Sequence, residues 1–133
     1  MGLGLILGYV GILLLAGLTP PGVGFLGELI VGIGSELLSW LHVPAFALLC
    51  WLITGAFYRR SWPRLYAWGA GMGCTILFGL WLEVLQGSVE GRVTAGEDLV
   101  IDALGATLAV AVDAYRISGL RRRTSSQLEV PLA

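Results

Sequence analysis

Residues 79–106, GLWLEVLQGSVEGRVTAGEDLVIDALGA, decide the fold because they place charged and amide side chains inside strongly apolar sequence. Ionisable groups within a membrane span are costly, and by default they indicate a functional site. This stretch therefore predicts the end of one transmembrane helix, a connecting loop and the start of another helix, arranged around a polar centre. The polar side chains concerned are Glu83, Gln86, Arg92, Asp98 and Asp102.

The composition indicates that the chain needs lipid around it. Of the 133 residues, 56% are hydrophobic and only 13% are charged, and the mean hydropathy is +0.84. Charged residues usually make up about 25% of a soluble domain. A chain of this length forms one domain with little interior, so we expect the lipid bilayer to be its main partner. The net charge of -1 gives no indication of nucleic-acid binding.

Four apolar segments are predicted to cross the bilayer, which makes the fold class an all-α bundle of four transmembrane helices. These spans are expected over residues 3–18, 43–58, 66–86 and 98–115. The first two are shorter than the ~20 residues that a span usually needs, so tilt or local thinning must compensate. Residues 22–41 are apolar but contain two glutamates and several glycines. We expect an amphipathic or re-entrant segment there, with a fifth span as the alternative.

The arginines predict the orientation. Seven of the eight basic residues lie between the second and third spans or after the fourth, and all eight are arginine. By the positive-inside rule, both termini are cytoplasmic. The expected arrangement is a transmembrane domain over residues 1–116 in a bacterial plasma membrane, followed by a cytoplasmic polar tail over residues 117–133. His42 and the polar centre of residues 83–102 then all lie at the extracytoplasmic end.

The carboxylates at this end are the candidates for acid–base chemistry, namely Glu83, Asp98 and Asp102. Asp98 also has a structural interpretation, because Thr94 and Glu97 form a capping box that favours acids in the first turn. Candidate ligand-binding side chains are His42, Gln86 and Arg92. Arg92 serves equally well as an anion anchor or as an ion-pair partner of the acids. The spacing of these residues predicts neither a metal site nor a bound cofactor.

The motifs of this region are similar to those of one known family. The pattern E-x-x-Q at 83–86, G-R at 91–92 and D-x-x-x-D-x-x-G at 98–105 resembles the VanZ-like membrane proteins. LHVPAFALL at 41–49, with His42 and Phe46, is similar to the first motif of that family. The resemblance covers roughly residues 36–112, although Glu90 stands where the family usually has proline.

The resemblance implies a function at the cell envelope, because some VanZ-like proteins are linked to teicoplanin resistance. The expected role is to bind or process an envelope ligand, either a glycopeptide antibiotic or a lipid-linked precursor. Two other hypotheses stay open. One is a proton-coupled small transporter or flippase subunit, which would need to form a homo-oligomer. The other is a structural accessory subunit of a larger membrane complex. The sequence assigns no enzymatic activity.

Overall fold

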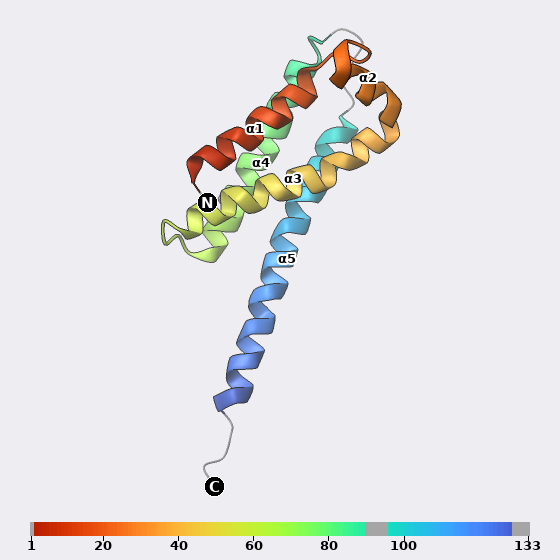
Figure 1. The fold of residues 1–133 in the computed structure, drawn as a ribbon. Helices are drawn as coiled ribbons and strands as arrows, with labels where there is room; N and C mark the ends of the chain where they lie inside the picture. The colour runs from red at the N-terminus through yellow and green to blue at the C-terminus, as the bar shows by residue number, and fades with distance from the viewer. Residues whose placement is uncertain (1, 90–95, 129–133) are drawn as a thin grey trace.

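The computed structural model describes residues 2–89 and 96–128, and all regular secondary structure in these two ranges is α-helical. This confirms the all-α prediction for the described part of the chain. Figure 1 shows how the helices are arranged. In chain order they are α1 (Leu3–Leu18), α2 (Gly24–Ile33), α3 (Ser35–Tyr58), α4 (Arg64–Gln86) and α5 (Glu97–Leu128).

Helices α3, α4 and α5 pack against one another, and the contact between α3 and α5 is the most extensive. The buried apolar core between them is small. Its members are Phe46, Leu49, Cys50, Leu52, Ala67, Leu82 and Ala106. Many large apolar side chains point outward instead, among them Leu77, Val84 and Val100, which are 66%, 68% and 70% exposed. Extensive exposed apolar surface is typical of contact with a membrane or a partner protein.

Two helices, α3 and α4, are long and apolar enough to cross a membrane. Helix α1 has 16 residues and so extends about 24 Å, less than the ~30 Å thickness of a hydrocarbon core. Helix α5 has 32 residues but carries Asp102 and Asp113 within its apolar part. The structure thus shows two helices of spanning length and composition where the sequence predicts four spans.

Helix α1 is fastened to the central helices by hydrogen bonds from two side chains. The Tyr9 hydroxyl donates to the carbonyl oxygen of Ala45 on α3 at 3.0 Å. The Gln86 amide of α4 donates to the carbonyl oxygen of Gly17 at 3.2 Å. Gly17 is buried, and a Cβ atom there would lie 2.8 Å from the Leu82 side chain. The absence of a side chain at Gly17 therefore lets the end of α1 lie close against α4.

The segment 22–41 divides into two helical pieces at Gly34. Gly34 has a φ of +82°, a left-handed conformation that favours glycine, and it separates α2 from α3. Residues 35–41 form the first turns of α3, which begins at Ser35 rather than at the predicted Val43 and continues through Pro44. At the other end of the chain, α5 continues past the predicted boundary at Tyr115 as far as Leu128. Helical backbone thus extends into the predicted polar tail.

Gly105 sets the distance between α3 and α5. A Cβ atom at Gly105 would collide with the carbonyl oxygen of Val43 and would lie 3.1 Å from the backbone nitrogen of Ala47. Backbone atoms cannot swing aside as a side chain can, so any larger residue must move one helix. Small residues at such crossings are how membrane helices approach closely.

We predict that Gly105→Ala lowers the thermal stability of the detergent-solubilised protein, with a loss on the order of 1–3 kcal/mol from overpacking. Gly73→Ala on α4 is the matched control, because no atom lies within 4 Å of a Cβ atom built there. Alanine is a better helix former than glycine by about 1 kcal/mol, so the control should melt at the wild-type temperature or above it. Equal melting temperatures for the two variants would contradict the proposed crossing.

Candidate functional site

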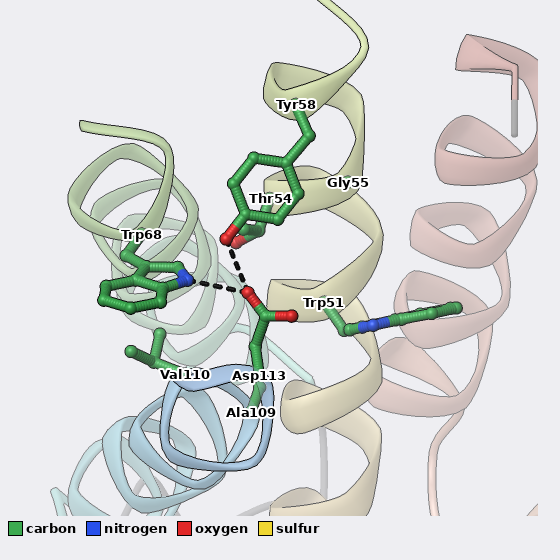
Figure 2. Close-up of a pocket in the computed structure, with 8 residues that line it drawn as sticks. All are labelled: Trp51, Thr54, Gly55, Tyr58, Trp68, Ala109, Val110 and Asp113. Atoms are coloured by element: carbon green, nitrogen blue, oxygen red, sulfur yellow. Dashed lines mark hydrogen bonds between the residues drawn. The ribbon is translucent and has the colours of Figure 1, made fainter. Parts of the chain in front are cut away.

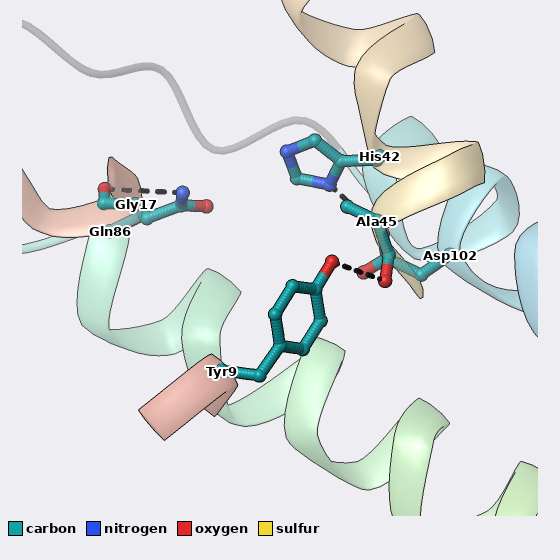
Figure 3. A network of polar contacts seen from close by, with 6 residues as sticks. All are labelled: Tyr9, Gly17, His42, Ala45, Gln86 and Asp102. Atoms are coloured by element: carbon teal, nitrogen blue, oxygen red, sulfur yellow. Dashed lines mark hydrogen bonds and ion pairs between the residues drawn. The ribbon is translucent and has the colours of Figure 1, made fainter. Parts of the chain in front are cut away.

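The half-buried His42 of α3 and the buried Asp102 of α5 form a pair. The Nδ1 atom of His42 lies 2.9 Å from Oδ1 of Asp102, and Figure 3 shows the imidazole directed at the carboxylate. The Asp102 residue is only 3% exposed. When the carboxylate is charged, the Nδ1–H group of His42 donates to it. Among the side chains that the structure describes, those of residues 2–89 and 96–119, it is the only ion pair.

Each of the three central helices contributes to the surroundings of this pair. Phe46, one turn after His42 on α3, stacks on the imidazole with ring centroids 5.5 Å apart and planes 10° apart. On α4, a Cβ atom at Gly79 would collide with Oδ2 of Asp102. Gly79 therefore leaves room for the carboxylate between the helices. A buried carboxylate without a partner would cost several kcal/mol, and the imidazole supplies that partner.

A cavity of about 190 Å³ lies beside the pair, between α1, α3 and α4. His42 contributes the polar side chain of its lining, and the other lining residues are apolar or glycine: Leu13, Ala16, Gly17, Leu38, Leu41, Ala45, Phe46 and Leu82. Pockets for drug-sized ligands are usually about 300–1,000 Å³. This cavity is smaller than that. It has room for part of an apolar chain, with the imidazole of His42 in its wall.

The other predicted site residues have different surroundings. Gln86 is buried, and its amide holds α1 through the carbonyl oxygen of Gly17. Glu83 and Asp98 are half-buried, and neither makes a hydrogen bond or ion pair to another residue that the structure describes. Arg92 lies outside the described residues, and so does its predicted contact with the acids. The structure thus brings His42 to Asp102 and gives Gln86 a packing role.

A second polar cluster, at the other end of the bundle, was not among the predicted site residues. Asp113 accepts hydrogen bonds at Oδ2 from the Tyr58 hydroxyl at 2.5 Å and from Trp68 Nε1 at 2.8 Å (Figure 2). Asp113 lies eleven residues after Asp102, which places it on the same face of α5 about 16 Å further along the axis. The spacing of the two aspartates is a sequence signal that Asp113 faces the same neighbours as Asp102. Tyr58 and Trp68 give no such signal, because aromatic residues at these positions also fit an interfacial belt.

The described residues show no metal site, and comparison with known proteins identifies no family. No group of three His, Cys, Asp or Glu side chains within them lies close enough together to hold a metal ion. Neither a model of a known protein family, nor a curated protein, nor a solved structure matches the chain. The resemblance to VanZ-like proteins therefore stays a prediction from the motifs.

We predict that Gln86→Met destabilises the protein by about 1 kcal/mol, because the buried carbonyl oxygen of Gly17 loses its donor. The measurement is thermal unfolding in detergent, together with protease cleavage of α1. Ser88→Ala is the control, since Ser88 is exposed and bonds only to Leu85 in its own turn. Wild-type stability in Gln86→Met, combined with loss of cellular function, would instead make Gln86 a ligand-binding residue.

Proposed function

We propose that the chain is an integral membrane protein that binds a lipid-linked envelope molecule at the extracytoplasmic end of its helix bundle. The observation that carries this proposal is that His42, which pairs with the buried Asp102, lines an apolar cavity. A polar pair joined to an apolar cavity suits a molecule with both a headgroup and a hydrocarbon chain. The resemblance of the surrounding motifs to VanZ-like proteins points to the same class of envelope-directed function.

The proposed topology has four spans, formed by α1, α3, α4 and α5, with α2 at the outer face. Arg59, Arg60 and Arg64 lie at the turn between α3 and α4, and Arg116 lies in the second half of α5. His42 lies in the N-terminal part of α3 and Asp102 in the N-terminal part of α5, so the pair is at the end of the bundle away from these arginines. The positive-inside rule then places the arginines in the cytoplasm and the His42–Asp102 pair toward the outer leaflet.

The size of the cavity favours a lipid-linked molecule over a glycopeptide antibiotic. At about 190 Å³, the cavity is smaller than the usual pocket for a drug-sized ligand, and a glycopeptide is larger still. A segment of a polyprenyl or acyl chain fits, and burying it contributes about 0.8 kcal/mol per methylene group. The headgroup would lie at His42, where the protonated imidazole donates an N–H group to a phosphate oxygen.

A second candidate function, proton-coupled transport, is favoured by a separate observation. Asp102 and Asp113 lie on one face of α5, and each is held by donors from neighbouring helices. The buried hydroxyl groups of Thr54 and Thr75 belong to the same helix bundle. Intramembrane acids arranged in this way are typical of proton relays. This hypothesis requires both carboxylates, whereas lipid binding at the outer end requires Asp102 alone.

We predict that a photoreactive polyprenyl phosphate crosslinks to α1 and to the first half of α3 in membranes containing the protein. Asp102→Asn keeps the shape of the side chain but loses its charge, and we expect crosslinking to fall at least fivefold. His42→Gln should behave in the same way. Asp98→Asn is the matched control, because this half-buried acid one turn away has no partner among the described residues.

Protein abundance and the melting temperature are measured for each variant, so that loss of binding is separated from loss of folding. Crosslinking that stays at the wild-type level in Asp102→Asn and His42→Gln would contradict the lipid-binding site. Normal crosslinking, together with proton uptake into vesicles that requires both Asp102 and Asp113, would favour the transporter. Full cellular function in both Asp102→Asn and His42→Gln would favour the remaining hypothesis, a structural accessory subunit of a larger membrane complex.

A further inference from the structure

One carboxylate oxygen of Asp113 accepts no hydrogen bond from the described residues, and Asp113 lines a cavity. Both hydrogen bonds from Tyr58 and Trp68 end on the same oxygen, Oδ2. Figure 2 shows the other oxygen, Oδ1, pointing away from these donors on the side of Trp51. A cavity of about 170 Å³ lies here, and its lining includes Trp51, Thr54, Tyr58 and Asp113. An acid within a helix bundle usually faces a partner, and Oδ1 has none among the described residues.

Thr54 is a second and independent indication of a missing partner. Thr54 lines the same cavity and is only 5% exposed, and its hydroxyl oxygen has no hydrogen-bond partner among the described residues. The nearby Cys50 thiol is a weak hydrogen-bonding group, and its geometry relative to Thr54 does not meet that of a hydrogen bond. Buried polar groups are nearly always satisfied. The hydroxyl packs against Gly71 of α4, so it is an unsatisfied polar group in the wall of the cavity, whereas Oδ1 of Asp113 is the acceptor left for an entering donor.

A larger groove adjoins this cavity on the surface of the bundle, between α3 and α5. It has a volume of about 420 Å³, and it shares Trp51, Ala109 and Asp113 with the smaller cavity. Its walls include Leu48, Leu108 and Val112, which are 42%, 49% and 44% exposed. An exposed apolar groove on a helix bundle of this composition suits a hydrocarbon chain.

Arg116 adds a positive charge at one end of this groove. It follows Asp113 by three residues, so both side chains lie on the same side of α5, and both line the groove. The structure shows no ion pair between these two side chains. The groove therefore offers a free carboxylate oxygen and a separate guanidinium group about one helical turn apart.

We propose that this groove binds a phospholipid with a primary ammonium group, phosphatidylethanolamine being the type, at the arginine-bearing end of the bundle. The ammonium group donates to Oδ1 of Asp113, the phosphate binds Arg116, and an acyl chain lies along Leu108 and Val112. A choline headgroup has no N–H donor, and a glycerol headgroup has no positive charge. The site is therefore selective for the primary amine. This proposal does not depend on the function proposed for the His42–Asp102 pair.

The experiment is native mass spectrometry of the full chain, delipidated in detergent and titrated separately with dioleoyl phosphatidylethanolamine, phosphatidylcholine and phosphatidylglycerol. We expect the ethanolamine lipid to bind at least tenfold more tightly than the other two. Asp113→Asn keeps an acceptor for Tyr58 and Trp68 but loses the charge. It should abolish this preference while leaving the binding of phosphatidylglycerol unchanged. Arg116→Gln should weaken the binding of all three lipids, since each carries a phosphate.

Two further variants keep the test decisive if Asp113→Asn does not fold. Leu108→Trp fills the groove without touching either charge and should reduce the binding of phosphatidylethanolamine at least fivefold. Asp98→Asn, at the other end of α5, should leave that binding unchanged. Equal binding of the three lipids would overturn the proposal. So would tight binding that survives both Asp113→Asn and Leu108→Trp, or binding that is lost in Asp98→Asn instead.

Discussion

The close crossing of α3 and α5 determines where the polar side chains of the bundle lie. Gly105 has no side chain, so its backbone rests against the carbonyl group of Val43. One residue before Val43 is His42, and one turn before Gly105 is Asp102, so the same crossing sets the distance between imidazole and carboxylate. Gly79 serves the third helix in a similar way, because it leaves space for Oδ2 of Asp102. The geometry of the ion pair thus depends on two glycines, Gly105 and Gly79, because neither has a side chain that would push the helices apart.

The bundle has two polar centres with different chemical character. The His42–Asp102 pair has both partners within the protein and adjoins a cavity that is otherwise apolar. The Asp113 cluster has two donors on Oδ2, and neither Oδ1 nor the Thr54 hydroxyl has a hydrogen-bond partner among the described residues; Arg116 lies nearby. The first centre is therefore suited to reversible proton binding or to a headgroup phosphate. The second is suited to a group that brings its own donors.

Much of the fold could be predicted from hydrophobic runs and from the residues that punctuate them. The bounds of α1 match the prediction, and α4 begins two residues before its predicted start and ends at the predicted Gln86. The start of α3 was placed too late, because Pro44 and the glycines before it suggest a break that the chain makes only at Gly34. The predicted end of α5 followed the loss of hydrophobicity after Tyr115. Backbone hydrogen bonding carries the helix further.

The candidate site could be predicted only in part. Helix orientation predicted that His42 and Asp102 lie in one layer, but sequence spacing cannot give a contact between residues on different helices. The hydrogen bond from Gln86 to Gly17 joins residues 69 positions apart, and no motif encodes it. Asp113 continued the face of Asp98 and Asp102, yet Tyr58 and Trp68 are also typical of a membrane interface. Their hydrogen bonds to Asp113 depend on how α3 and α4 lie against α5.

The most direct test of the central claim is a nitrogen NMR spectrum of the imidazole, because the chain contains a single histidine. In protein labelled with ¹⁵N-histidine, every imidazole signal therefore comes from His42. We predict that the Nδ1 resonance is protected from solvent exchange, and that it shifts in Asp102→Asn but not in Asp98→Asn. An Nδ1 resonance that exchanges freely with water and is the same in wild type and Asp102→Asn would contradict the pair.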